Sequence, residues 1–338
     1  MTRSWCEILI SRARGAAPAL LIAGLMTAMP PASASPVLAA ACAVPAVAGA
    51  HGLDSAKASG SGAGGGSNAI EVEGGTASPV ASPPVVTAAP VDPARTLDGD
   101  LTAVAEALAA CLSAGDAKMV TALAGERYLG QLFGSSVPMS SQEYESIAEE
   151  LTPVPTRIID LEEVTPVDSS HATALVTHVV GNQLMESEWT FEQAPQGDRT
   201  AGQSPWRVAG ERQLPAEPPR GAVAIAVTID DNAFTLDRPE VKGPDVVLRG
   251  ENDDSIDHEM LVVRLAEGYT TDDLLRASGP DLPQEVTYVG EIPVRAGASR
   301  DLVLVGLKPG VYTLICLFTD SDGVPYLAYG MSAEFRVK

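Results

Sequence analysis

Apolar residues along this chain recur at two different spacings, and the change of spacing separates its regions. Between 98 and 114 they return every three or four positions, which predicts a helix that Gly115 ends. The same spacing predicts a helix over 117–133 and a shorter one over 141–151, which Pro153 stops. Helices are therefore expected to form the first part of the folded chain.

The spacing then changes to two, which is the period of a β-strand. Ser187, Trp189 and Phe191 alternate with polar residues, as they would in a half-buried antiparallel strand. Four strands are expected in this region, at 157–164, 172–180, 185–193 and 206–214. Helices followed by an antiparallel meander predict an α+β domain over 98–215.

A Pro-rich hinge at 216–220 precedes a second domain, 221–338, in which almost every segment has the pattern of a strand. Gly and Pro turns follow one another at short intervals, which favours an all-β Greek-key sandwich. Its strands are expected at 223–229, 245–249, 258–265, 286–292, 299–305, 310–318 and 331–337. The chain is thus expected to be multidomain, with an α+β domain before a β-sandwich.

The N-terminus has the pattern of an export signal. Arginines precede an apolar run at 16–29, and Ala32-Ser33-Ala34 suits a signal peptidase, so residues 1–34 are expected to be a signal peptide. Retention of this segment as a membrane anchor is the alternative, and no second apolar run could span a membrane. Residues 35–97 are rich in Ala, Gly, Ser and Pro and are expected to be a disordered linker. The protein is therefore expected to be secreted or to reside in the cell envelope.

Charge and cysteine content exclude several classes of function. The formal net charge is −22, from 44 acidic and 22 basic side chains, which disfavours binding to nucleic acid or to anionic membranes. The four cysteines form no CxxC pair, so neither a zinc ribbon nor a disulfide framework is expected. Cys42 is expected to be an unpaired thiol in the linker, and Cys111 to pack in the apolar stripe of the first helix.

The first domain resembles the SnoaL-like or nuclear-transport-factor-like cone fold over 98–215. The resemblance rests on the order of its elements and on AEALAACLSAGDAKMVTALAGERY at 105–128. It implies a sheet curled around a long helix, with a pocket between them. The candidate pocket residues are His171, His178, Tyr128, Tyr144, Asp160, Glu186 and Glu188. The spacing of these residues does not predict a catalytic site, and a fold alone does not assign an activity.

The second domain resembles the cupredoxins, the blue-copper family, over 221–338. Three segments carry this resemblance: NDDSIDHEM at 252–260, LKPGVYTLIC at 307–316 and PYLAYGMSAEFRV at 325–337. They imply that His258, Cys316 and Met331 stand where the family's copper ligands lie. A blue-copper centre needs one thiolate, two imidazoles and a weak thioether.

The second imidazole is missing from this set. Tyr326 occupies the place where plastocyanin-like members have it, and His258 is the only histidine after residue 178. A phenol, with a reference pKa of about 10, replaces an imidazole poorly. A complete type-1 site is therefore not expected. A softer Cu(I) site formed by His258, Cys316 and Met331, extended by Met260, is the alternative.

These observations favour an exported, non-enzymatic protein that binds a small molecule or an envelope protein and carries no cofactor. The first alternative is a copper-binding or electron-transfer protein that uses His258, Cys316 and Met331. The second alternative is a lyase or isomerase that acts in the pocket of the cone domain. No catalytic residue is assigned, because nucleophile and phosphate-loop motifs are absent from the sequence.

Overall fold

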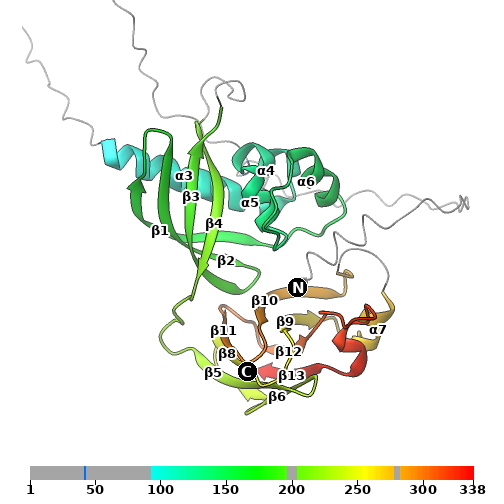
Figure 1. The fold of residues 1–338 in the computed structure, drawn as a ribbon. Helices are drawn as coiled ribbons and strands as arrows, with labels where there is room; N and C mark the ends of the chain where they lie inside the picture. Colours follow the sequence, from blue (N-terminus) through cyan, green and yellow to red (C-terminus); the bar gives the residue numbers. More distant parts are fainter. Residues whose placement is uncertain (1–41, 43–92, 196–203, 278–281) are drawn as a thin grey trace, which may run out of the picture.

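The computed structural model describes residue 42 and residues 93–195, 204–277 and 282–338, which form a helix-and-sheet part followed by a part made mostly of strands (Figure 1). The predicted signal peptide and linker lie outside these residues, apart from Cys42 and the start of the first helix. Among the described residues, no helix combines the length and apolarity needed to cross a membrane.

The first part begins with four helices and continues with four antiparallel strands. The helices are α3 (Pro93–Ala114), α4 (Ala117–Leu123), α5 (Glu126–Gln131) and α6 (Ser141–Ala148). The strands are β1 (Thr156–Pro166), β2 (His171–Val180), β3 (Gln183–Gln193) and β4 (Trp206–Leu214). Leu101 and Leu108 of α3 pack in one core with Trp189 and Phe191 of β3. The helical spacing at 98–114 and the alternation at 185–193 are thereby confirmed.

The second expected helix is divided in two. The sequence predicted one helix over 117–133, but α4 ends at Leu123 because Ala124 forms a β-bridge with Val208. The Gly125 amide donates a hydrogen bond of 2.8 Å to the Val208 carbonyl, and α5 then starts at Glu126. A pairing with a distant strand thus replaces the helical hydrogen bonds at this point.

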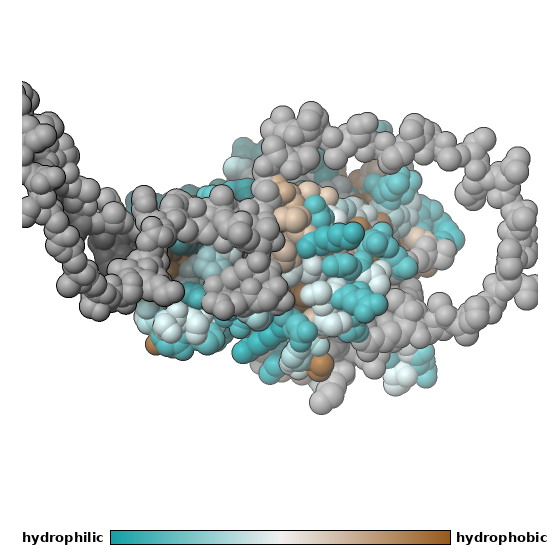
Figure 2. Space-filling view, turned by 90° about the horizontal axis from the view of Figure 1, so that it is seen from above, coloured by the Kyte–Doolittle hydropathy of each residue, from teal (hydrophilic) through white to brown (hydrophobic). Residues whose placement is uncertain are grey.

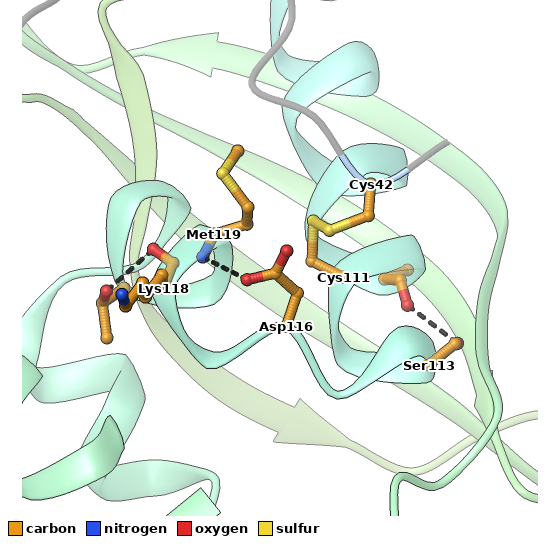
Figure 3. The surroundings of a disulfide bond; sticks show 8 residues. Cys42, Cys111, Ser113, Asp116, Lys118 and Met119 are labelled. Atoms are coloured by element: carbon orange, nitrogen blue, oxygen red, sulfur yellow. Dashed lines mark hydrogen bonds between the residues drawn. A yellow bond between two sulfur atoms is a disulfide. The ribbon is translucent and has the colours of Figure 1, made fainter. Parts of the chain in front are cut away.

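A disulfide joins Cys42 to Cys111 on α3 (Figure 3). The expectation of an unpaired Cys42 is therefore wrong. Cys111 is fully buried and belongs to the core of the first part, as predicted, and Cys42 packs against the same core. Spacing along the chain could not reveal this pair, because 69 positions separate the two cysteines.

The remaining strands form a two-sheet sandwich. They are β5 (Val223–Asp230), β6 (Ala233–Leu236), β7 (Glu240–Val241), β8 (Val246–Asn252), β9 (His258–Leu265), β10 (Val286–Val294), β11 (Ser299–Leu304), β12 (Gly310–Ile315) and β13 (Ser332–Val337). A short helix, α7 (Thr271–Arg276), has a capping box at Thr270. One sheet has the order β10-β9-β12-β13-β7, and β11-β8-β5-β6 belong to the other. Their facing apolar side chains form the core of the sandwich.

The two parts share one sheet, because β3 of the first part lies beside β11 of the second. Asn182 lies in the turn between β2 and β3. Its backbone amide donates a hydrogen bond to the Val289 carbonyl, and its backbone carbonyl accepts one from the Val305 amide, both at 2.8 Å. The Asn182 side chain also donates to the Val305 carbonyl at 2.9 Å. The Pro-rich segment is thus accompanied by direct pairing between the two parts, which the sequence did not predict.

Hydrophilic residues dominate the described surface seen in Figure 2, as the acidic composition predicts. Exposed large apolar side chains among the described residues are few and include Val137, Val167 and Tyr329. Among the described residues, the buried apolar side chains form three clusters, one in the first part and two in the second.

Candidate metal centre

Three adjacent strands bring the candidate copper ligands to one end of the sandwich. His258 is the first residue of β9, Cys316 follows the last residue of β12, and Met331 precedes β13. Because β12 runs antiparallel to both neighbours, its C-terminal end meets the N-terminal ends of β9 and β13. Residues separated by up to 73 positions thereby become neighbours.

The central contact of this end is between the thiol of Cys316 and the imidazole of His258. The Cys316 Sγ lies 3.7 Å from the His258 Nδ1. His258, Cys316 and Met331 are all fully buried. The Cys316 amide also donates to the Met331 carbonyl at 3.4 Å, so the backbones of these two residues are fixed beside each other. The structure therefore brings the three sequence-predicted residues together.

The orientation of the imidazole is set by Asp254. The His258 Nε2 lies 3.3 Å from the Asp254 Oδ2, and a proton on Nε2 would leave the Nδ1 lone pair facing Cys316. Burial lowers the pKa of His258 below its ordinary value, although Asp254 opposes this shift. The imidazole is therefore neutral at pH 7 and can donate its lone pair to a metal.

The thiol of Cys316 is protonated when no metal is bound. Burial, assisted by the nearby Glu259 carboxyl, raises the pKa of Cys316 to about 12. A positive charge beside the sulfur, such as a bound metal ion, would stabilise the thiolate near neutral pH.

Glu259 connects the strands that carry Cys316 and His258, and the sequence analysis missed it. Its buried Oε1 accepts a 2.8 Å hydrogen bond from the Leu317 amide, next to Cys316. Burial raises the pKa of Glu259 well above its ordinary value, and the neighbouring Glu291 adds to the shift. The signal that could have identified it is an acidic residue directly before the apolar run 260–263 of β9, since a buried carboxyl needs a partner.

Tyr326 lies beside this centre, in the one-turn 3₁₀ helix η2 (Tyr326–Tyr329). The centres of the Tyr326 and His258 rings are 4.9 Å apart, with the ring planes at 69°. Tyr326 is half-buried and packs on the core cluster that contains Cys316 and Met331. The residue at the expected second-histidine place is therefore in contact with the first histidine.

Met260 takes no part in the centre. Its thioether packs against Gly250 of β8, so closely that a Cβ at Gly250 would lie 2.7 Å from the Met260 Sδ. The soft donors are thereby limited to Cys316 and Met331. Among the described residues, no three His, Cys, Asp or Glu side chains gather as they would around a zinc or calcium ion.

The candidate pocket residues of the first part do not converge. His178 is buried beside Trp189, whereas His171 is on the opposite face of β2 and pairs with Asp168. Tyr128 and Tyr144 are buried in the core, Asp160 is exposed, Glu186 is half-buried, and Glu188 pairs with Arg212. A polar group that the sequence analysis missed lies in the same region: the Ser187 hydroxyl donates a 2.6 Å hydrogen bond to Glu211.

Comparison with known proteins finds similarity to solved structures only. No family model matches the chain, and no curated protein matches it. An auracyanin from Roseiflexus castenholzii is 21% identical, covers 35% of this chain and 99% of its own, and has a TM-score of 0.25. Auracyanin A, a blue copper protein from Chloroflexus aurantiacus, is 20% identical, with 35% of this chain and all of its own covered and the same TM-score.

A multicopper oxidase from Aquifex aeolicus is 12% identical over 47% of this chain and 41% of its own, with a TM-score of 0.23. The resemblance of 221–338 to cupredoxins therefore rests on the sequence motifs and on the two-sheet sandwich. These values say nothing about a bound metal. The resemblance of 98–215 to a SnoaL-like cone stays a prediction.

The donors that the structure brings together suit a soft ion. Bonds of about 2.0 Å to nitrogen and about 2.3 Å to sulfur are typical of zinc, a first-row ion. Because the sum of these two lengths exceeds the 3.7 Å between His258 Nδ1 and Cys316 Sγ, these two residues could hold one ion of that size. One imidazole, one thiolate and one thioether fit copper(I), whereas the second imidazole of a type-1 centre is missing.

Proposed function

We propose that the second domain binds copper(I) through His258, Cys316 and Met331. The observation that carries this proposal is the 3.7 Å approach of the His258 Nδ1 to the Cys316 Sγ beside a fully buried methionine. The copper-binding alternative of the sequence analysis is therefore preferred to a binding module without metal.

The chemistry of the three donors supports the monovalent ion. Thiolate and thioether are soft ligands that select copper(I), and a neutral imidazole also suits it. His258 is neutral at pH 7, and the Cys316 thiol gives up its proton when a cation binds. With Tyr326 in place of a second imidazole, a blue cupric centre and electron transfer through it are not proposed.

We also propose that copper is bound outside the cytoplasm. The arginine-rich start and apolar run at 16–29 support export. The Cys42–Cys111 disulfide supports an oxidising compartment, because such bonds are rare in the cytosol. Under this proposal the protein holds copper(I) in the cell envelope or the medium, with no catalytic role for the first domain.

Anaerobic titration with copper(I) against a chromophoric cuprous chelator tests the proposal. The full chain should carry Cys6→Ser, which removes a thiol that lies outside the described residues. One ion should bind per chain, and Cys316→Ser should weaken binding by more than about 100-fold, because the thiolate is the only anionic donor.

The matched control is a pair of methionine variants. Met331→Leu should weaken copper(I) binding, whereas Met260→Leu should leave it unchanged, because the Met260 thioether packs against Gly250. Equal affinities for the wild-type chain and the Cys316→Ser variant would disprove the proposed function.

A further inference from the structure

Tyr326 differs from the other residues of the centre in its exposure. His258, Cys316 and Met331 are inaccessible to solvent, whereas Tyr326 is half-buried and has one side in the core and one in solvent. Tyr326 therefore lies at the boundary between the buried donors and the solvent, in contact with His258.

The backbone holds Tyr326 firmly in this place. Its amide donates to the Phe318 carbonyl at 2.9 Å, and its carbonyl accepts from the Met331 amide at 3.2 Å. The next residue, Leu327, donates to the Cys316 carbonyl at 2.9 Å. These bonds fix the backbone of Tyr326 beside the segments that carry two of the three donors.

The Tyr326 ring packs against the imidazole as a ring-to-ring contact, with the two planes at 69° and the centroids 4.9 Å apart. A phenol oxygen is a hard donor and is protonated at pH 7, so it does not compete for a soft ion.

We propose that Tyr326 is the specificity-determining residue of the centre: it covers the donors without binding the ion, limits the ion to three protein ligands, and so restricts the centre to copper(I). This inference rests on the proposed copper(I) binding. It adds that the oxidation state and the rate of metal release are set by a single side chain that replaces a ligand.

Three variants of the full Cys6→Ser chain test this role. Tyr326→Phe keeps the ring and removes the hydroxyl, so the copper(I) dissociation constant should change by less than about threefold if the phenol is not a ligand. Tyr326→His restores the second imidazole and should produce an intense blue thiolate-to-copper(II) absorption band that the parent chain lacks. Tyr326→Ala removes the cover and should speed the release of copper(I) to excess chelator at least about tenfold, because it opens the centre to solvent.

The result for each Tyr326 variant supports or overturns the proposed role of this residue. A loss of more than about tenfold in copper(I) affinity on Tyr326→Phe would show that the phenol is a ligand and would overturn the inference. A blue band in the parent chain, or its absence in a folded Tyr326→His variant, would overturn it as well. Denaturant unfolding of each variant checks the fold, and the phenylalanine and histidine variants suffice if the alanine variant does not fold.

Failure of the proposed copper(I) binding would give results different from failure of the inference about Tyr326. In that case the parent chain binds no copper(I), and Cys316→Ser changes nothing. If the parent chain binds the ion through Cys316 but the tyrosine variants contradict the expectations above, only the inference about Tyr326 falls.

Discussion

The Cys42–Cys111 disulfide should contribute strongly to stability. It closes a loop between residues 69 positions apart, and the bond persists in the unfolded chain. A loop of this length removes conformational entropy worth about 4 kcal/mol from the unfolded state at 25 °C. Cys42→Ser should therefore lower the free energy of unfolding by up to about 4 kcal/mol. Cys42 is the better position to replace, because a serine at the fully buried Cys111 would add the separate penalty of a buried hydroxyl.

Urea denaturation followed by tryptophan fluorescence measures this difference. The reduced wild-type chain should unfold at the same urea concentration as Cys42→Ser, and the oxidised chain at a higher one. Because Cys6 lies in the expected signal peptide, the exported, unreduced and unfolded wild type should show one free thiol, Cys316, with Cys42 and Cys111 paired. Three free thiols after export to an oxidising compartment, or equal stability of the oxidised chain and Cys42→Ser, would refute the reasoning.

The remaining predictions concern the packing of α5, the proton balance of the centre and the joint between the two parts. Gly130→Ala should destabilise the protein by about 2–3 kcal/mol, because the alanine Cβ would overlap the Val137 carbonyl. Gly99→Ala, in the exposed part of α3, should stabilise the protein by up to about 1 kcal/mol, and thermal denaturation measures both changes. Because the pKa of Cys316 is about 12, binding of copper(I) should release one proton from its thiol. The measured copper(I) affinity should therefore rise about tenfold per pH unit from pH 7 to 8.5 and fall as the pH is lowered. A copper(I) affinity independent of pH would show that no thiolate forms. Asn182→Ala removes the side-chain bond to Val305 and should lower stability by about 1 kcal/mol in the same unfolding assay; an unchanged midpoint would show that this bond is not needed at the joint.

Much of the fold could be predicted from the sequence, because local periodicity determines most of its elements. The alternation at 172–180 and 185–193 corresponds to β2 and β3, and the strand predicted at 258–265 is β9. What could not be predicted depends on contacts between distant segments. The break after Leu123 follows from pairing with Val208, and the sheet shared by the two parts follows from the contacts of Asn182.

The same distinction applies to the candidate centre. The resemblance of three motifs to those of cupredoxins identified His258, Cys316 and Met331. These residues lie together because β9, β12 and β13 are neighbours in one sheet. Spacing could not show that Met260 points to Gly250, because two residues on one strand face share a direction but not a neighbour. Nor could it show that Glu259 accepts a hydrogen bond from Leu317, since that bond exists only after the strands pair.

Copper K-edge X-ray absorption of the anaerobically loaded chain tests the central claim most directly, because it reports the oxidation state and the bound atoms together. The account predicts a cuprous edge and a first shell dominated by sulfur, from Cys316 and Met331, with a single imidazole from His258. A cupric edge, or a first shell of nitrogen and oxygen without sulfur, would contradict it.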